Sequence, residues 1–285
     1  RVPAAAVHVT EFEDQPLEAH VIQMGPIGRA KIPLAFIVLF GSLICIATDV
    51  VHRTLVASMG AFLVLGLLLW CNMMPSFALV VEWIDESTLG LLFGMMVIIG
   101  KMAETGLFEV ITAKVVRASN GDMSRLTTLM CLITAVLSAF LDNVTTMLLI
   151  APITIELMVT LSRDPVPLLI AETLFSNIGG AATLIGDPPN IIVGSAFPQD
   201  ITFVDFLAHM LPVVAIMFIP TLYLIKWVYK GKLSGEIEGF DSALKLCETY
   251  GITNYTLLVQ CCTVLITVLL LFCLHSLHHV NPAWV

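Results

Sequence analysis

The long apolar runs of this chain are the feature that most limits what it can fold into. A helix needs about 20 apolar residues to cross a bilayer. The runs cover residues 31–50, 54–72, 88–106, 126–161, 168–197, 206–227 and 254–275. Hydrophobic residues make up 58% of the chain and charged residues 12%, whereas soluble domains carry about 25% charged residues. The sequence therefore predicts an all-α polytopic membrane protein with about six spans.

The polar segments between the runs indicate how the chain is oriented. Residues 1–30 are polar, residues 107–119 have the spacing of an interfacial helix, and residues 228–253 form a polar linker. If residues 1–30 are luminal or extracellular, nine of the 13 basic residues fall on the cytoplasmic side, as the positive-inside rule requires. These nine are Arg53, Lys114, Arg117, Arg125, Arg163, Lys226, Lys230, Lys232 and Lys245. The linker 228–253 is then cytoplasmic.

The first interruption is "FLDNVTT" (140–146), which divides the run 126–161. An Asp at the centre of a membrane helix costs about 2.5–3.5 kcal/mol on insertion scales, so a tip that faces a cavity is the better place for Asp142. One long helix, two full spans and a re-entrant hairpin with arms 126–141 and 144–161 are all compatible with the sequence. The chemistry favours the re-entrant hairpin, and a kinked turn without a ligand role is the alternative.

The second interruption is "SNIGGAATLIGDPPN" (176–190), which divides the run 168–197. The glycine pair permits close backbone approach, and the proline pair suits the start of a new helix. We expect a broken helix, with halves at 168–178 and 188–197. In secondary transporters, such breaks bind ions and substrates near the bilayer midplane. The candidate ion or substrate ligands from both interruptions are Asp142, Asn143, Thr145, Asn177, Gly179, Gly180, Thr183, Asp187 and Asn190.

The two motifs "LDNVTTMLLIAPI" (141–153) and "NIGGAATLIGDPPNIIV" (177–193) resemble those of the ion-transporter superfamily, which includes citrate and dicarboxylate carriers, arsenite efflux pumps and sodium/proton antiporters. Together with "VVEWIDESTLGLLFGMM", they look most like the melanosomal P protein branch. The resemblance implies two inverted repeats, each with a hairpin followed by a broken helix. Residues 31–227 would form the first repeat and residues 254–285 the truncated start of the second, so we expect a fragment.

The resemblance places the shared site at the tip, Asp142 to Val144, and in the loop from Gly179 to Asn190. In dicarboxylate carriers the tip reads Ser-Asn-Thr, and this departure argues against sodium-coupled dicarboxylate uptake. A carboxylate partly removed from water favours its neutral form, so Asp142 and Glu172 are candidate proton-linked residues. The alternative is an Asp142 that stays charged and only caps or orients the tip. The coupling ion is expected to be H⁺ or Na⁺.

The predicted function is transmembrane transport of a small ion or an organic or inorganic anion by a secondary carrier similar to citrate transporters. The resemblance implies that this carrier is coupled to protons and sets the pH of a melanosome-type organelle. An anion channel and an inactive fragment or scaffold are the alternatives. Expected partners are the bilayer and either a second half of the protein or a second copy. We expect no enzyme activity, no bound metal, no cofactor and no nucleic acid, because no nucleophile–base pair or phosphate loop occurs and the basic residues are scattered.

Overall fold

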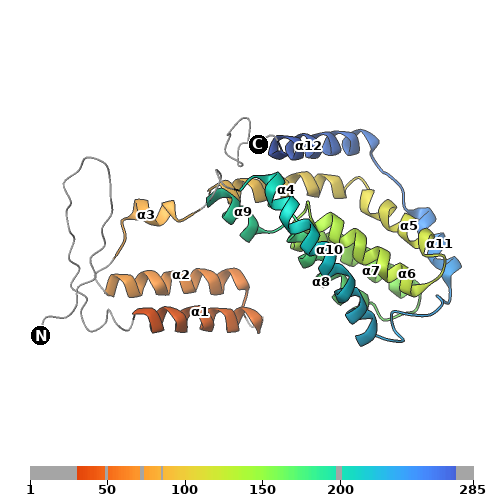
Figure 1. Cartoon of the computed structure of the whole chain (residues 1–285), viewed down its shortest axis with the longest axis horizontal. Coiled ribbons are helices and arrows are strands. Elements are labelled where there is room, and N and C mark those ends of the chain that lie inside the picture. The colour runs from red at the N-terminus through yellow and green to blue at the C-terminus, as the bar shows by residue number, and fades with distance from the viewer. Residues whose placement is uncertain (1–30, 49–50, 71–73, 85, 197–200, 274–285) are drawn as a thin grey trace, which may run out of the picture. The chain divides into compact units, whose positions relative to one another are not determined.

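A computed structural model of the chain describes residues 31–48, 51–70, 74–84, 86–196 and 201–273 (Figure 1). The predicted luminal segment 1–30 and the end of the predicted second repeat, 274–285, lie outside these residues. The regular elements of the described residues are all helices, with a single isolated bridge between Asp122 and Glu236. The predicted all-α class is confirmed.

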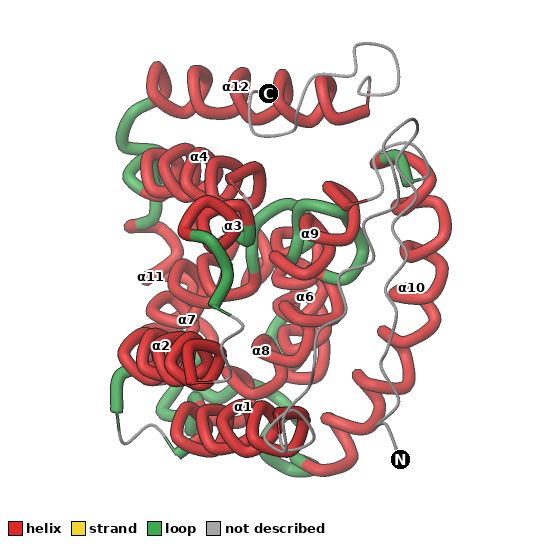
Figure 2. The backbone as a smooth tube through the Cα atoms, turned by 90° about the vertical axis from the view of Figure 1, so that its left-hand side faces the viewer, coloured by secondary structure: helices red, strands yellow, loops and turns green. Residues whose placement is uncertain are grey.

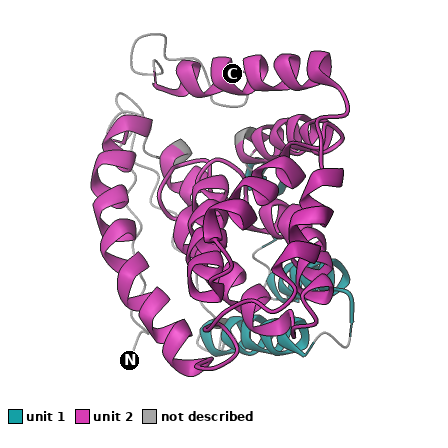
Figure 3. Ribbon diagram, turned by 90° about the vertical axis from the view of Figure 1, so that its right-hand side faces the viewer, with its two compact units in different colours: residues 1–84 teal, residues 85–285 magenta. Residues whose placement is uncertain are grey.

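The chain divides into two compact units, residues 1–84 and 85–285 (Figure 3). The first unit holds α1 (Lys31–Ala47), α2 (Arg53–Trp70) and the short α3 (Phe77–Glu82). α1 and α2 pack side by side as a helical hairpin. Their apolar side chains, such as Phe62, are largely exposed, as expected for helices whose solvent is lipid rather than water.

The second unit contains both interruptions. Its helices are α4 (Glu86–Ala103), α5 (Leu107–Ser119), α6 (Met123–Ser138), α7 (Asn143–Thr160), α8 (Val166–Gly180), α9 (Pro188–Ala196), α10 (Phe203–Val228), α11 (Phe240–Thr249) and α12 (Tyr255–Cys273). α6 packs closely on α8, and α7 packs on both (Figure 2). These three helices therefore form the centre of the unit.

The run 126–161 forms two helices, α6 and α7, joined by a turn at residues 139–142. Aspartates begin both helices: Asp122 Oδ1 accepts a hydrogen bond from Ser124 N (3.0 Å), and Asp142 Oδ1 accepts one from Thr145 N (2.9 Å). Both bonds satisfy a backbone N–H that has no partner within its helix. The sequence located this turn correctly.

The run 168–197 is broken as predicted, into α8 and α9. α8 continues through the glycine pair and ends at Gly180, two residues beyond the predicted end. α9 begins at Pro188. Proline suits this position because the N–H of a first helical residue has no partner within the helix, so nothing is lost when that N–H is missing. Residues 181–187 connect the two halves without helix, and we call them the break.

Four described helices are long and apolar enough to cross a membrane: α2, α7, α10 and α12. α4 and α5 form a pair bent by 64°, which makes a fifth candidate if the pair is one span. α1, α6 and α8 are apolar but shorter. The polytopic class thus holds, but the predicted count of six is not reproduced by length and composition in the described part of the chain.

The two ends of the α6–α7 hairpin lie against one segment, the linker that follows α10. At the start of α6, Met123 N donates to Gly235 O (3.0 Å). Just after α7, Arg163 Nη2 donates to Glu236 O (2.9 Å), and Asp164 forms an ion pair with Lys232 (3.0 Å). We call these contacts the base clasp. They place both ends of the hairpin on the same side as the C-terminal end of α10.

Candidate functional site

The turn of the hairpin, residues 139–142, meets the break between α8 and α9. Thr183 Oγ1, in the break, donates a hydrogen bond to the carbonyl oxygen of Ala139, in the turn. The same hydroxyl accepts a bond from Gly186 N (3.1 Å). Thr183 therefore ties the turn to the break. This contact brings together two motifs that lie 44 residues apart in the sequence.

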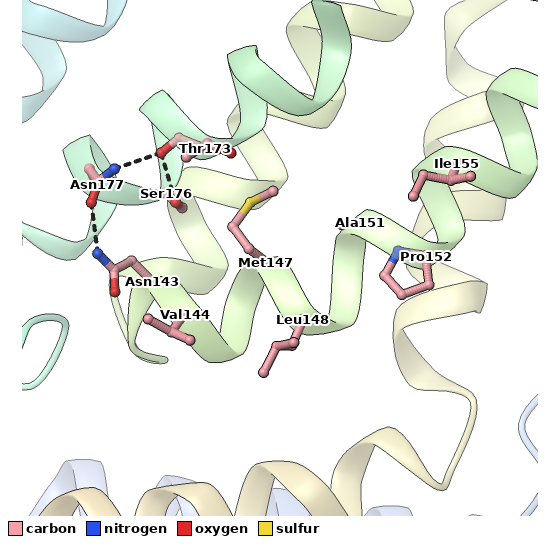
Figure 4. Close-up of a pocket in the computed structure, with 10 residues that line it drawn as sticks. All are labelled: Asn143, Val144, Met147, Leu148, Ala151, Pro152, Ile155, Thr173, Ser176 and Asn177. Atoms are coloured by element: carbon pink, nitrogen blue, oxygen red, sulfur yellow. Dashed lines mark hydrogen bonds between the residues drawn. The ribbon is translucent and has the colours of Figure 1, made fainter. Parts of the chain in front are cut away.

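A second connection joins α7 to α8 through two amide side chains (Figure 4). Asn143 Nδ2 donates to Asn177 Oδ1 (2.7 Å), and Asn177 Nδ2 donates to Thr173 O (2.9 Å). The chain of bonds fixes the orientation of both amides. Among the described residues, no donor reaches Asn143 Oδ1, so this oxygen is left for a ligand or water.

Asp142 begins α7 and binds its first turn twice. Its Oδ1 accepts from Thr145 N, and its Oδ2 accepts from the Thr145 hydroxyl. Asp142 and Asp187 are close enough for their charges to interact. The structure thus places the candidate proton-linked carboxyl of Asp142 half-buried at the tip of the hairpin. A second acid, Asp187, lies near it in the break. It also gives Asp142 the capping role that the sequence left as the alternative.

The glycines at the end of α8 allow the backbones to approach. A Cβ on Gly179 would stand 2.1 Å from Ala135 O of α6, and a Cβ on Gly180 would stand 2.7 Å from Asp187 Oδ2. A Cβ on Gly186 would stand 2.3 Å from Gly180 O. Gly179 and Gly186 face backbone atoms and therefore require glycine, whereas a side chain at Gly180 would force the Asp187 side chain to move. The sequence reasoning named the first two and missed Gly186, although it lies within the same motif.

Asn190 closes the break from the other side. Its Nδ2 donates to Gly180 O (3.2 Å) and to Thr183 O (3.0 Å). These bonds satisfy one carbonyl at the end of α8 and one within the break, where no helical donor is available. Asn190 is thus a structural support of the break, and its amide donors are directed at backbone rather than at open space.

Four helix ends meet at this place: the C-termini of α6 and α8 and the N-termini of α7 and α9. Helix N-termini carry a partial positive charge and C-termini a partial negative one. An anion is therefore favoured beside α7 and α9, and a cation beside the carbonyls of α6 and α8. The arrangement suits an ion site without any fully charged basic residue.

A pocket of about 490 Å³ opens beside the two asparagines (Figure 4). Its lining residues come from one face of α7 and the facing side of α8: Asn143, Val144, Met147, Leu148, Ala151, Pro152, Ile155, Thr173, Ser176 and Asn177. The polar groups gather at one end, and apolar side chains form the rest of the wall. The sequence reasoning missed the contributions of Thr173 and Ser176, which lie one turn and one residue before Asn177.

Of the predicted site residues, nine lie at the turn or the break and one does not. Asp142, Asn143 and Thr145 are at the turn; Asn177, Gly179 and Gly180 end α8; Thr183 and Asp187 are in the break; and Asn190 is in the first turn of α9. Glu172 instead lies in the interior between helices, fully buried, where it accepts a bond from Thr154 (2.9 Å). Within the described residues, no three His, Cys, Asp or Glu side chains are placed to share a metal ion.

Comparison with known proteins agrees with this architecture. The profile of the citrate transporter family matches residues 43–285. The human P protein is 44% identical over 217 residues, which cover 74% of this chain and 26% of the P protein. A protein of Mycobacterium tuberculosis named as an uncharacterized transporter is 41% identical over 202 residues, 71% of this chain and 46% of its own length.

The chain thus spans about a quarter of the P protein and about half of the mycobacterial relative. The family match extends over most of the chain and includes the turn, the break and both flanking helices. The apolar helices and this match identify the chain as a multi-pass membrane protein. The chain belongs to the citrate transporter family.

Proposed function

We propose that the turn and the break together form one half of the substrate site of a secondary carrier for a small ion or a small organic or inorganic anion. The observation that carries this proposal is the bond between Asn143 and Asn177, which joins two interrupted membrane segments and leaves Asn143 Oδ1 facing a pocket. A hairpin with a purely structural turn would have no need of polar side chains there. The helix N-termini of α7 and α9 supply the attraction for an anion.

The coupling ion in this proposal is the proton, and Asp142 carries it. Asp142 is half-buried beside the substrate pocket and faces a second carboxyl, Asp187. One proton or cation held between two neighbouring carboxylates would offset the repulsion between their charges. Sodium in place of the proton is the outcome to be distinguished by experiment.

The other half of the site comes from a second repeat, supplied by a longer chain or by a second copy. Support for this lies in the pocket wall of α7, where Leu148 is 69% exposed and Val144 50% exposed beside polar site residues. A bilayer would tolerate such side chains, but it would not complete a polar ion site. A repeat of inverse orientation would bring its own turn and break to this face.

The cellular role follows from the P protein relatives. We infer a multi-pass protein of a melanosome-type organelle membrane, with residues 1–30 luminal and the base clasp cytoplasmic, whose transport sets luminal pH. The distribution of basic residues supports this orientation. The identity with the P protein supports the type of organelle.

The test is uptake of radiolabelled citrate by liposomes that contain the full-length protein, driven by an imposed pH gradient. A hydrogen bond to a charged group contributes about 1.5–3 kcal/mol, and the Asn143–Asn177 bond positions the amide oxygen that would contact an ionic substrate, so Asn143→Ala or Asn177→Ala should lower uptake about tenfold or more. The double variant should lose little more than either single variant, because both remove the same bond. Gln260→Ala, an exposed amide of α12, is the control and should transport normally.

Uptake that is unchanged in both asparagine variants would refute this site. Uptake that follows a sodium gradient and ignores the pH gradient would replace the proton with sodium. A conductance that does not saturate with citrate or chloride concentration would identify a channel instead of a carrier, since a carrier must bind and release its substrate in each cycle.

A further inference from the structure

The interior between α6, α7 and α8 contains polar side chains that have no hydrogen-bond partner. Glu172 is 0% exposed; its Oε1 accepts from Thr154 Oγ1 (2.9 Å), but its Oε2 has no partner. Three hydroxyls on the neighbouring helices are also buried and unpaired. They belong to Thr134 and Ser138 of α6 and Thr146 of α7.

Each unpaired oxygen is costly where it stands. A buried polar group without a partner destabilises the fold, and the hydrocarbon of a bilayer supplies no water to replace the lost bond. Other buried threonines in this unit avoid the loss by donating to their own helix: Thr127 donates to Met123 O (2.9 Å) and Thr112 to Phe108 O (3.0 Å). Thr134, Ser138 and Thr146 do not, so their oxygens remain available to something in the interior.

The unpaired oxygens lie on α6, α7 and α8, at successive levels from the substrate site toward the interior of the unit. Ser138 is the last residue of α6 before the turn, and Thr134 lies one helical turn below it. Thr146 lies one turn into α7, after Asp142. Glu172 lies five residues before Asn177, about 7.5 Å along α8 at 1.5 Å per residue. The hydroxyls therefore occupy the levels between the substrate site and Glu172.

No basic side chain of the described residues compensates Glu172. The nearest titratable group from α6 is the Cys131 thiol. Lys226 of α10 is beyond it and donates to Ser124 Oγ (2.8 Å) and Thr128 Oγ1 (2.7 Å). On α7, Glu156 faces outward and accepts from Tyr250 (2.9 Å). Asp142 and Asp187 are the titratable groups at the tip.

An ionised carboxylate accepts several hydrogen bonds, and Glu172 receives one from the described residues. The neutral acid fits this environment better, because it needs fewer donors and its own O–H can be given to a water molecule. The three hydroxyls supply both donors and acceptors for water. Buried waters of this kind make two to four hydrogen bonds to otherwise unpaired groups.

We propose that Glu172 is an internal proton site, separate from the substrate pocket, that exchanges its proton with the tip through water molecules held by Thr134, Ser138 and Thr146. The proposal rests on the proposed function in taking the proton as the coupling ion. When the site loads, a hydronium ion at the tip gives up one proton, an O–H bond forms at Oε2, and a neutral water molecule remains. Unloading reverses these steps.

The test is infrared spectroscopy of the full-length protein in lipid nanodiscs, which reads the C=O stretch of neutral carboxylic acids. The difference between the parent protein and Glu172→Gln should contain such a band at neutral pH. After transfer to D₂O, the band should shift promptly in the parent protein. The shift should be slow in the double variant Thr134→Val/Thr146→Val, whose methyl groups replace the hydroxyls at the same volume.

Thr127→Val is the matched control, since Thr127 is equally buried on α6 but already bonded within its helix. It should leave both the band and its deuterium shift unchanged. If no neutral-acid band depends on Glu172, the proton site is refuted. If the band is present but its shift is as fast in the double variant as in the parent, the hydroxyl route is refuted.

The spectrum reports protonation whether or not citrate moves, so it separates this inference from the proposed function. A band with the expected deuterium shift, in a protein whose asparagine variants transport normally, would uphold the proton site and refute the substrate site. Transport that depends on Asn143 and Asn177, in a protein without the band, would do the reverse.

Discussion

At the scale of single residues, Gly179 leaves the least room for a side chain among the described glycines. The nearest atoms to a Cβ there are backbone atoms of Ala135, which cannot turn away as a side chain can. Gly179→Ala should therefore force α6 and α8 apart and lower the free energy of unfolding by about 1–3 kcal/mol, the usual loss for overpacking. The midpoint of thermal unfolding in detergent measures this loss.

Gly100→Ala in α4 is the control for the same substitution, because a Cβ at Gly100 meets nothing within 4 Å. Alanine is a better helix former than glycine by about 1 kcal/mol, so this variant should be at least as stable as the parent. Equal stability of the two variants would show that α6 and α8 do not touch at Gly179.

Asp142 combines a structural and a proposed chemical role, and two substitutions separate them. Asp142→Asn keeps an oxygen that can cap α7, so stability should stay near that of the parent. Asp142→Ala removes the cap and should cost about 0.5–2 kcal/mol. In the Asn variant, the dependence of transport on pH should disappear, because the amide cannot carry a proton.

The readouts are the thermal midpoint of both variants and citrate uptake by the Asn variant across a series of pH values. Uptake by Asp142→Asn with the pH profile of the parent would leave Asp142 with the capping role alone. Equal midpoints for the Asn and Ala variants would remove the capping role.

Residues also show where sequence reasoning reached its limit. The composition of 140–146 and 176–190 was enough to locate the turn and the break, since Asp, Asn, Gly and Pro have strong local effects on a helix. The partners were not readable: Asn143 and Asn177 lie 34 residues apart, and their contact depends on how α7 and α8 pack. Glu172 was placed on the correct half-helix, but its burial away from the turn depends on the same packing.

At the scale of elements, the base clasp holds the hairpin to the linker after α10. A hydrogen bond from Lys232, with a second from Val166 N, lowers the pKa of Asp164 below its usual value. Unfolded aspartate has a pKa of about 3.9, so the ion pair contributes fully above that pH. The contribution is lost as the pH falls through the lower pKa of the folded state.

Amide hydrogen exchange of residues 229–239, corrected for the intrinsic effect of pH, tests this behaviour. Exchange should be slow at neutral pH and accelerate below about pH 4, as the carboxylate is protonated. Asp164→Asn should exchange faster at neutral pH and show no acceleration on acidification. Asp241→Asn, which changes an exposed acid of α11 that takes no part in the base clasp, should behave as the parent. An acid response that persists in Asp164→Asn would assign it to other groups.

Elements were predicted more accurately at their interrupted ends than in their number of crossings. The prolines at 188 and 189 and the Asp-Asn pair at 142–143 are local signals, so the starts of α7 and α9 were predicted within one residue. α6 begins at Met123, three residues before the predicted arm, because the cap by Asp122 was not recognised. Length alone does not say how deep a helix lies. α6 ends at the turn and α8 ends at the break, but the sequence does not show how deep in the membrane these two ends lie.

At the scale of the whole molecule, the base clasp and α10 together indicate on which side of the membrane each loop lies. α10 has 26 residues and is about 39 Å long, more than the roughly 30 Å of the hydrocarbon core. A helix of this length can place its two ends on opposite sides of the membrane, and we propose that α10 does so. The clasp joins its C-terminal end to the start of α6 and the end of α7, so all three share one side. We propose that this side is cytoplasmic, as the distribution of basic residues predicts.

Cysteines introduced one at a time test this topology against a reagent that cannot cross the membrane, with the parent protein as the baseline for its own cysteines. Ser234→Cys in the linker and Ala118→Cys near the end of α5 should both react from the cytoplasmic side. Val204→Cys, at the start of α10, should react only from the luminal side. All three positions are exposed, so burial would not mask a result.

Reaction of Ser234→Cys and Val204→Cys from the same side would mean that α10 does not cross the membrane. Reaction of Ser234→Cys and Ala118→Cys from opposite sides would contradict the clasp. The expected pattern would leave the turn and the break as the polar groups that a substrate must pass, because they lie between the two labelled faces.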